Sequence, residues 1–193
     1  MSNRVAIITA AGKGMGAACA RELSQQGYQV ALMSRSESSL ELAQELGGLG
    51  VQGSVTEKDD LKKLVNATLG KFGRIDAVVN NTGHPAKGKL LELGEEDWHQ
   101  GLNLVVLNVA KMAQLVTPVM QKQGGGAFVN ISTFAAYEPS PSFPISSVLR
   151  AALGSYAKLY ADQYAKDNIR MNNLLPGFID SYPDQRRSVI PYP

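Results

Sequence analysis

The fold is decided by the stretch Thr9-Ala10-Ala11-Gly12-Lys13-Gly14-Met15-Gly16. It begins at the end of Val5-Ala6-Ile7-Ile8-Thr9, which is apolar on both faces and typical of a strand buried in a parallel sheet. Residues 15–26 then have the apolar spacing of a helix, which ends at Gly27. Glycines at such a turn let the backbone bend sharply and approach a pyrophosphate at the helix N-terminus. The stretch therefore predicts a dinucleotide-binding fold rather than a plain glycine-rich turn.

Outward from this turn, short apolar segments alternate with segments of helical spacing. No two strand patterns are joined by a hairpin signal, and strict alternation specifies a parallel sheet with helices on both faces. We therefore predict an α/β fold, a single doubly wound Rossmann domain over residues 1–193. Strands are predicted at 5–9, 30–33, near 51, 77–79, 127–131 and 171–175, and helices at 15–26, 40–46, 61–69, 96–122 and 147–166.

Composition narrows the class of protein further. The chain has 193 residues, of which 44% are hydrophobic and 19% charged, as in an ordinary globular domain. A formal charge of +2 is too small to indicate a nucleic acid or an anionic membrane as partner. The N-terminus lacks signal-peptide architecture, and no apolar run approaches the roughly 18 residues that span a bilayer. We expect a cytoplasmic protein that acts on a small-molecule substrate, with no metal, nucleic acid or membrane partner.

The second predicted strand indicates which dinucleotide is bound. Sites for NAD usually carry an acidic residue about 20 residues after the glycines, where it accepts hydrogen bonds from the ribose 2′-hydroxyl. Here the strand ends in Met33-Ser34-Arg35-Ser36, and Glu37 lies beyond it, where the next helix is expected to start. Arg35 and Lys13 would attract a 2′-phosphate. The pattern favours NADP(H), with a solvated surface role for Arg35 as the alternative.

Four motifs resemble those of the short-chain dehydrogenase/reductase family, and together they cover nearly the whole chain. The glycine stretch is similar to the family's T-G-x-x-x-G-x-G, with Ala10 in place of the first glycine. Asn80-Asn81-Thr82-Gly83 resembles N-N-A-G, and Asn130-Ile131-Ser132-Thr133 resembles N-I-S-S. Ile169 to Asn172, followed by Pro176-Gly177-Phe178-Ile179-Asp180-Ser181, resembles the sixth strand and the P-G loop that holds the nicotinamide.

The resemblance implies which residues bind the cofactor. Ile179 would face the carboxamide of the nicotinamide and Ser181 the phosphates. The full predicted set comprises the glycine turn, the ends of the second, third and fourth strands, and the P-G loop: Gly12, Lys13, Gly14, Met15, Gly16, Ser34, Arg35, Ser36, Ser54, Val55, Asn81, Thr82, Gly83, Pro176, Gly177, Ile179 and Ser181.

The chain departs from the family at the catalytic tetrad of Asn, Ser, Tyr and Lys. No tyrosine is followed by a lysine four residues later. Because Arg150-Ala151-Ala152-Leu153 resembles the family's K-A-A-L, Arg150 falls on the lysine position and Ser146 on the tyrosine position. The same register puts Thr133 on the serine position and Val105 on the asparagine position. Two asparagines, at 103 and 108, lie close to the last of these.

These substitutions change the chemistry that the tetrad could perform. Thr133 keeps a hydroxyl that could bind a substrate carbonyl, whereas Ser146 is a much weaker acid than tyrosine and could act only through water. Arg150 stays charged and could bind ribose hydroxyls or steady a developing alkoxide, while Val105 cannot relay protons. Loss of a positioned general acid typically costs about 10²- to 10⁴-fold in rate. His84, next to Gly83, is an alternative proton donor or a plain surface histidine.

Two functional hypotheses follow from intact cofactor motifs beside an altered tetrad. The first is an NADP(H)-dependent oxidoreductase that acts on a carbonyl or alcohol substrate. The second is a non-catalytic NADP(H)-binding protein, such as a cofactor sensor or an assembly subunit. In either case, broad apolar faces on the helices at 96–122 and 147–166 predict a homodimer or homotetramer.

The end of the sequence differs from the family as well. Family members usually continue past the P-G loop through a further helix and a last strand. Here a polar, proline-bearing tail runs from Tyr182 to Pro193. We expect a sheet that lacks its edge strand or a shortened chain.

Overall fold

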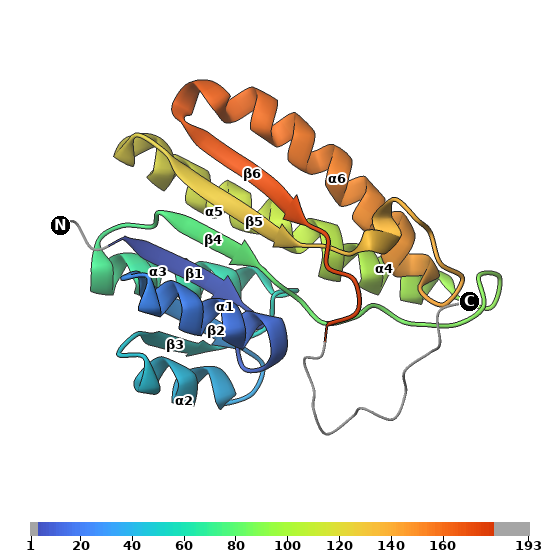
Figure 1. The fold of residues 1–193 in the computed structure, drawn as a ribbon, viewed down its shortest axis with the longest axis horizontal. Helices are drawn as coiled ribbons and strands as arrows, with labels where there is room; N and C mark the ends of the chain where they lie inside the picture. Colours follow the sequence, from blue (N-terminus) through green and yellow to red (C-terminus); the bar gives the residue numbers. More distant parts are fainter. Residues whose placement is uncertain (1–3, 180–193) are drawn as a thin grey trace.

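The computed structural model describes residues 4–179 and contains one six-stranded sheet (Figure 1). All neighbouring strands pair in parallel, in the order β3-β2-β1-β4-β5-β6. The chain order reverses between β1 and β4, and in open parallel sheets ligands bind at such a switch point, beyond the carboxyl ends of the strands. The strands are β1 (Val5–Thr9), β2 (Gln29–Ser34), β3 (Leu49–Gln52), β4 (Ala77–Asn80), β5 (Gly126–Ile131) and β6 (Ile169–Leu174).

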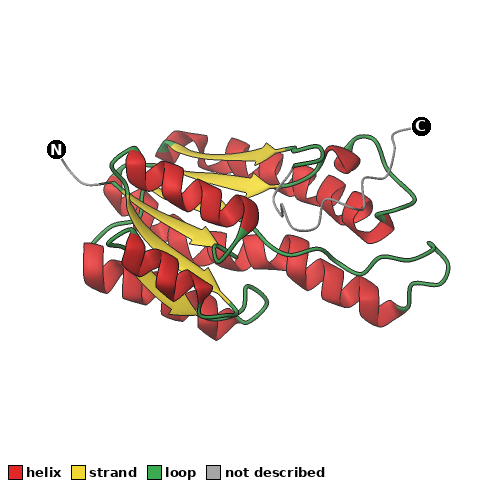
Figure 2. Ribbon diagram, turned by 60° about the horizontal axis from the view of Figure 1, so that its bottom comes forward, coloured by secondary structure: helices red, strands yellow, loops and turns green. Residues whose placement is uncertain are grey.

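Helices cover both faces of this sheet, as Figure 2 shows. One face packs against α1 and α2 through residues such as Ala20 and Leu42, and the other packs against α3, α5 and α6 through residues such as Leu64, Met112 and Leu153. Alternate residues of each strand serve the two faces, which is why the strands are apolar throughout. The helices are α1 (Gly14–Gln25), α2 (Ser38–Glu45), α3 (Lys58–Phe72), α4 (Glu95–Leu102), α5 (Asn108–Gln123) and α6 (Pro144–Tyr164).

The predicted α/β fold is confirmed, and each predicted strand is present with small shifts at its ends. The sixth strand begins at Ile169 rather than Met171, because Asn168 takes a left-handed conformation (φ +57°) directly before it. The carbonyl oxygen of Asn168 accepts a hydrogen bond from the Gly126 amide, so pairing with β5 starts at once.

The helix predicted over 96–122 is interrupted in the structure. A π-helical turn, η1 (Asn103–Leu107), separates α4 from α5. Such turns are rare and occur often at functional sites. By length and composition, the continuous stretch Glu95–Gln123 could cross a membrane, and it is the one helix among residues 4–179 that meets this test. The core helix of a globular domain meets it too, and α5 buries Met112, Val116 and Met120 in the core.

Candidate functional site

The glycine turn joins β1 to α1, with Lys13 exposed at the N-cap of the helix. Gly14 has a φ of +57°, a left-handed conformation that favours glycine. Gly16 is buried, and a Cβ atom there would lie 2.4 Å from the carbonyl oxygen of Ala10. The turn therefore folds tightly on itself and presents the N-terminus of α1 at the carboxyl end of the sheet, where a pyrophosphate would bind.

The end of β2 lies against this turn. A Cβ atom on Gly12 would lie 2.9 Å from Ser34 Oγ and 2.0 Å from Ser38 Oγ, so glycine is needed for this approach. Ser34 Oγ donates a hydrogen bond to the carbonyl oxygen of Ser36 at 2.8 Å. Arg35 is exposed, and no carboxylate within residues 4–179 forms an ion pair with it.

The turn after β3 has a fixed shape. Asp60 accepts a hydrogen bond from the Ser54 amide at 2.8 Å, and the hydroxyls of Ser54 and Thr56 lie 2.8 Å apart. Val55 is buried against the core. Lys111 of α5 donates to the Thr56 carbonyl at 3.0 Å and to Asn103 Oδ1 at 2.7 Å, which ties this turn to the π-helical turn.

The end of β4 brings the third motif to the switch point. Thr9 Oγ1 donates to the carbonyl oxygen of Asn81 at 2.7 Å and accepts from the Asn81 amide at 2.9 Å, so β1 and β4 are joined beyond their last paired residues. Gly83 is exposed. Thr82 Oγ1 is buried without a hydrogen-bond partner among the residues that the structure describes. An unpaired buried hydroxyl is costly, so this atom is available to a bound ligand.

The four residues predicted at the tetrad positions have different surroundings. Thr133 caps a 3-10 turn, η2 (Phe134–Ala136), where its Oγ1 accepts a hydrogen bond from the Ala135 amide at 3.4 Å. Ser146 is half-buried in the first turn of α6, and Val105 is buried in the core within the π-helical turn. Arg150 is 6% exposed and donates from Nη1 to the carbonyl oxygen of Ile131. Burial lowers the pKa of Arg150 to about 10, so the guanidinium remains cationic at neutral pH.

His84 lies on the loop after β4, near two cationic side chains. Partial burial of the ring, followed by the charges of Lys87 and Arg150, lowers the pKa of His84 below its ordinary value. The imidazole is therefore mostly neutral at pH 7 and holds little of the proton that a general acid must give.

The P-G loop follows β6 and is held against η2. The Phe134 amide donates to the carbonyl oxygen of Pro176 at 3.2 Å, and the rings of Phe134 and Phe178 lie 5.7 Å apart. Gly177 and Ile179 are exposed. Ser181, the residue expected to face the phosphates, lies outside the described residues.

A row of asparagines across three strands was missed by the sequence analysis. Asn80 Nδ2 donates to Asn130 Oδ1 at 2.8 Å, and Asn130 Nδ2 donates to Asn173 Oδ1 at 2.8 Å. The three residues occupy matching register positions in β4, β5 and β6. Asparagine is unusual in buried parallel strands, so its recurrence near three strand ends was the available signal.

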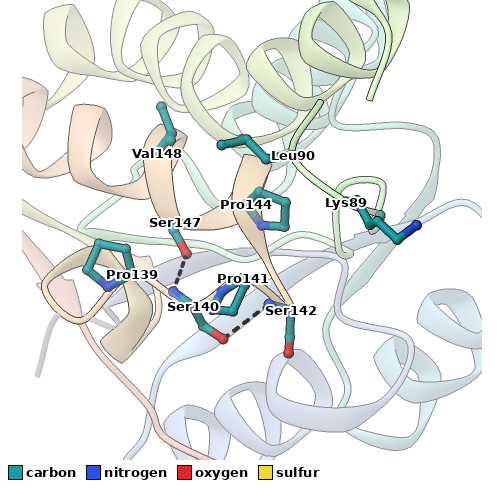
Figure 3. Close-up of a pocket in the computed structure, with 10 residues that line it drawn as sticks. Lys89, Leu90, Pro139, Ser140, Pro141, Ser142, Pro144, Ser147 and Val148 are labelled. Atoms are coloured by element: carbon teal, nitrogen blue, oxygen red, sulfur yellow. Dashed lines mark hydrogen bonds between the residues drawn. The ribbon is translucent and has the colours of Figure 1, made fainter. Parts of the chain in front are cut away.

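Two cavities flank the start and middle of α6. The larger, about 650 Å³, is lined mainly by Leu90, Val148 and the prolines of the loop before α6 (Figure 3). In that loop the Ser140 amide donates to Ser147 Oγ at 3.3 Å, and the Ser142 amide donates to Ser140 Oγ at 3.3 Å. The smaller, about 510 Å³, lies between α6, η2 and the end of β6 and includes Arg150 in its lining.

Comparison with known proteins identifies the family. The short chain dehydrogenase family matches this chain over residues 4–188. The chain belongs to that family. Dehydrogenase/reductase SDR family member 4 of Caenorhabditis elegans is 37% identical over 190 residues, covering 94% of this chain and 73% of the relative. The human protein of the same name is 37% identical over 186 residues, covering 93% of this chain and 67% of its own length.

Solved short-chain dehydrogenase structures share the fold. L-Sorbose reductase from Gluconobacter frateurii, complexed with NADPH and L-sorbose, has a TM-score of 0.88 at 30% identity, over 95% of this chain and 72% of that one. A 7α-hydroxysteroid dehydrogenase complexed with NADH has a TM-score of 0.86 at 27% identity, over 92% of this chain and 72% of that one. The predicted family resemblance is thus confirmed, and with it the oxidoreductase class. The first of these two structures contains NADPH and the second contains NADH, which lacks the 2′-phosphate.

Proposed function

We propose that this short-chain dehydrogenase is an NADP(H)-dependent oxidoreductase that acts on a carbonyl or alcohol substrate through an altered tetrad. The end of β2 carries the proposal. There the exposed guanidinium of Arg35 lies between two serines, and no carboxylate within residues 4–179 pairs with it. Glu37 is the N-cap of α2 and lies beyond the strand, so no acidic residue stands at the strand end to repel a 2′-phosphate.

The chain fits a dinucleotide along the switch point. Glycines at 12 and 16 leave space that side chains would fill. The buried hydroxyl of Thr82 has no hydrogen-bond partner in the described structure and can bind the ligand. We infer that Gly12 to Gly16 bind the pyrophosphate, that Arg35 and Ser36 bind the 2′-phosphate, and that Thr82 lies toward the nicotinamide end. When bound, the dinucleotide supplies or accepts a hydride.

Substrate binding, charge stabilisation and proton delivery would fall to the side chains at the tetrad positions. Thr133 would donate a hydrogen bond to the substrate oxygen. The guanidinium of Arg150 would stabilise negative charge that develops on that oxygen, because a preorganised cation acts strongly in a site with little water. Ser146 would hold the water that delivers the proton. Val105 contributes packing alone.

A paired calorimetric titration tests the cofactor assignment. Wild-type protein should bind NADPH at least about 10-fold more tightly than NADH, because a charge-assisted hydrogen bond contributes roughly 1.5–3 kcal/mol. Arg35→Met should remove this preference and leave NADH affinity unchanged. Arg170→Met is the matched control, since Arg170 is also exposed but lies on β6, across the sheet. Equal wild-type affinities for the two dinucleotides would refute the assignment.

A second candidate function, a non-catalytic NADP(H)-binding protein, is favoured by one observation. None of Val105, Thr133, Ser146 and Arg150 carries a group that titrates near neutral pH. Under this alternative, protein with bound NADPH should show no turnover across a broad panel of reactive carbonyls. Efficient turnover that is lost in Thr133→Val or Arg150→Met protein would eliminate it.

We also propose that the chain acts in the cytoplasm as a homodimer or homotetramer. The exposed apolar residues Val148 and Leu159 of α6 support self-association, since exposed apolar side chains on one helix suit a protein interface.

A further inference from the structure

The cavity of about 510 Å³ beside α6 has a more polar lining than the larger cavity. Its lining includes the cations Arg150 and Lys158, the amide of Asn173 and the hydroxyl of Ser132, but no aspartate or glutamate. Lys158 binds Asp162 on the exposed side of the helix. The buried donors therefore lack an anionic partner within the described part of the chain.

Arg150 is the centre of this set. A guanidinium has five N–H donors, and here the carbonyl oxygen of Ile131 accepts a hydrogen bond from one of its nitrogens. The side chain is 6% exposed, and residues 4–179 contain no carboxylate that pairs with it. A buried charge of this kind is costly unless an anion compensates it.

The asparagine row directs a second donor into the cavity. Asn130 and Asn173 each accept a hydrogen bond from the asparagine before them, so Asn173 Oδ1 is occupied by Asn130 Nδ2. The NH₂ group of Asn173 is left over, and Asn173 lines the cavity. Gly154 lies beside this group, because a Cβ atom there would be in van der Waals contact with Asn173 Nδ2, at 4.0 Å.

Ser132 supplies a third donor. The residue is 5% exposed, it lines the same cavity, and its Oγ is buried without a hydrogen-bond partner in the described structure. Leu159 and Leu175 form apolar parts of the wall. Buried donors beside an apolar wall suit a ligand with an anionic head and a hydrocarbon tail.

We propose that this cavity is a binding site for the carboxylate of a small organic acid, held by Arg150, Asn173 and Ser132. A carboxylate matches the planar fork of a guanidinium and can accept from the other two donors as well. The site shares Arg150 with the proposed active site. Carboxylate binding itself requires neither turnover nor a dinucleotide, so it can be tested separately from the proposed function.

Calorimetry of the full chain with hexanoate, and with hexanamide as its neutral analogue, tests the proposal. Hexanoate should bind about 10- to 100-fold more tightly than hexanamide, as expected for charge-assisted hydrogen bonds. Arg150→Met should weaken hexanoate binding by the same factor and leave hexanamide binding unchanged. Lys89→Met is the control, because Lys89 is a cation that lines the other cavity.

A second variant and a stability measurement separate loss of the site from loss of the fold. Gly154→Leu should abolish hexanoate binding by filling the cavity while Arg150 stays in place, and thermal unfolding confirms that each variant is folded. Equal binding of hexanoate and hexanamide, or unchanged hexanoate binding in either Arg150→Met or Gly154→Leu, would overturn the proposal. Binding of inorganic phosphate but not hexanoate would overturn it too, by showing that the cavity selects another anion. None of these readouts depends on NADPH, so they are independent of the cofactor assignment.

Discussion

The side-chain amide of Asn81 donates a hydrogen bond of 3.1 Å to the carbonyl oxygen of Ala10, a residue whose φ is +46°. A left-handed conformation is unfavourable for alanine, and the position corresponds to a glycine in the family motif. This hydrogen bond from Asn81, which directly follows β4, holds the strained peptide in place. The buried Gly16 lies against the same carbonyl oxygen.

Ala10→Gly should therefore stabilise the protein. Relief of the left-handed strain is worth roughly 1–2 kcal/mol, and the extra freedom of glycine in the unfolded chain offsets roughly 0.5–1 kcal/mol of it. We expect the free energy of unfolding in urea to rise by about 0.5–1 kcal/mol. Ala11→Gly, at a buried neighbour with negative φ, should have the opposite effect. A loss of stability in Ala10→Gly would contradict the strain argument.

Gly16→Ala should destabilise the protein and weaken dinucleotide binding. The added Cβ atom would lie 2.4 Å from the backbone oxygen of Ala10 and 2.7 Å from Asn81 Nδ2, so the turn must move. Overpacking of this kind costs roughly 1–3 kcal/mol. Gly70→Ala in α3 is the control, since it has open space and should gain about 0.5–1 kcal/mol from helix propensity. Chemical denaturation gives the free energy of unfolding of both variants. If Gly16→Ala and Gly70→Ala change it by similar amounts, the turn accommodates the added Cβ atom without cost.

The lowered pKa of His84 makes stability depend on pH. The unfolded ring takes up a proton near pH 6.5, before the folded ring does, so acidification below about pH 6.5 favours the unfolded state. Stability should therefore fall between about pH 7 and pH 5 by more in the wild type than in His84→Gln. An NMR titration of the ring should show a midpoint below 6.5. A higher midpoint would revive His84 as a proton donor.

Self-association through α6 can be tested by light scattering. Val148 and Leu159 are 52% and 69% exposed and lie 11 residues apart, which places them on the same face of the helix. The wild type should form a dimer or tetramer, and Val148→Glu combined with Leu159→Glu should yield monomers. Leu40→Glu on α2 should leave the assembly intact. A monomeric wild type would end this hypothesis.

The fold was predictable because its information is local. The strand before Gly12 is apolar on both faces, and each later strand is separated from the next by a helical pattern, so parallel topology followed without contacts from distant residues. The family motifs sit at strand ends, and they were readable for the same reason. The π-helical turn at Asn103–Leu107 was not readable, because its residues continue the apolar spacing of the helices around it.

The surroundings of the residues predicted at the tetrad positions depend on distant contacts instead. Nothing in the residues next to Arg150 reveals that its side chain is buried and donates to the carbonyl oxygen of Ile131, which is 19 residues away. The row of Asn80, Asn130 and Asn173 requires the register of three strands, with separations of 50 and 43 residues. Helical and strand periodicities describe faces of one element, so they cannot show which polar groups meet across elements.

The row of Asn80, Asn130 and Asn173 also limits which substitutions the protein tolerates. Replacing Asn130 by leucine would leave a donor on Asn80 and an acceptor on Asn173 unmet at once, whereas replacing all three together would leave none. Single exchanges are therefore penalised more heavily than the triple exchange. The three asparagines should be inherited or lost as a unit, so their joint presence would mark common descent among relatives.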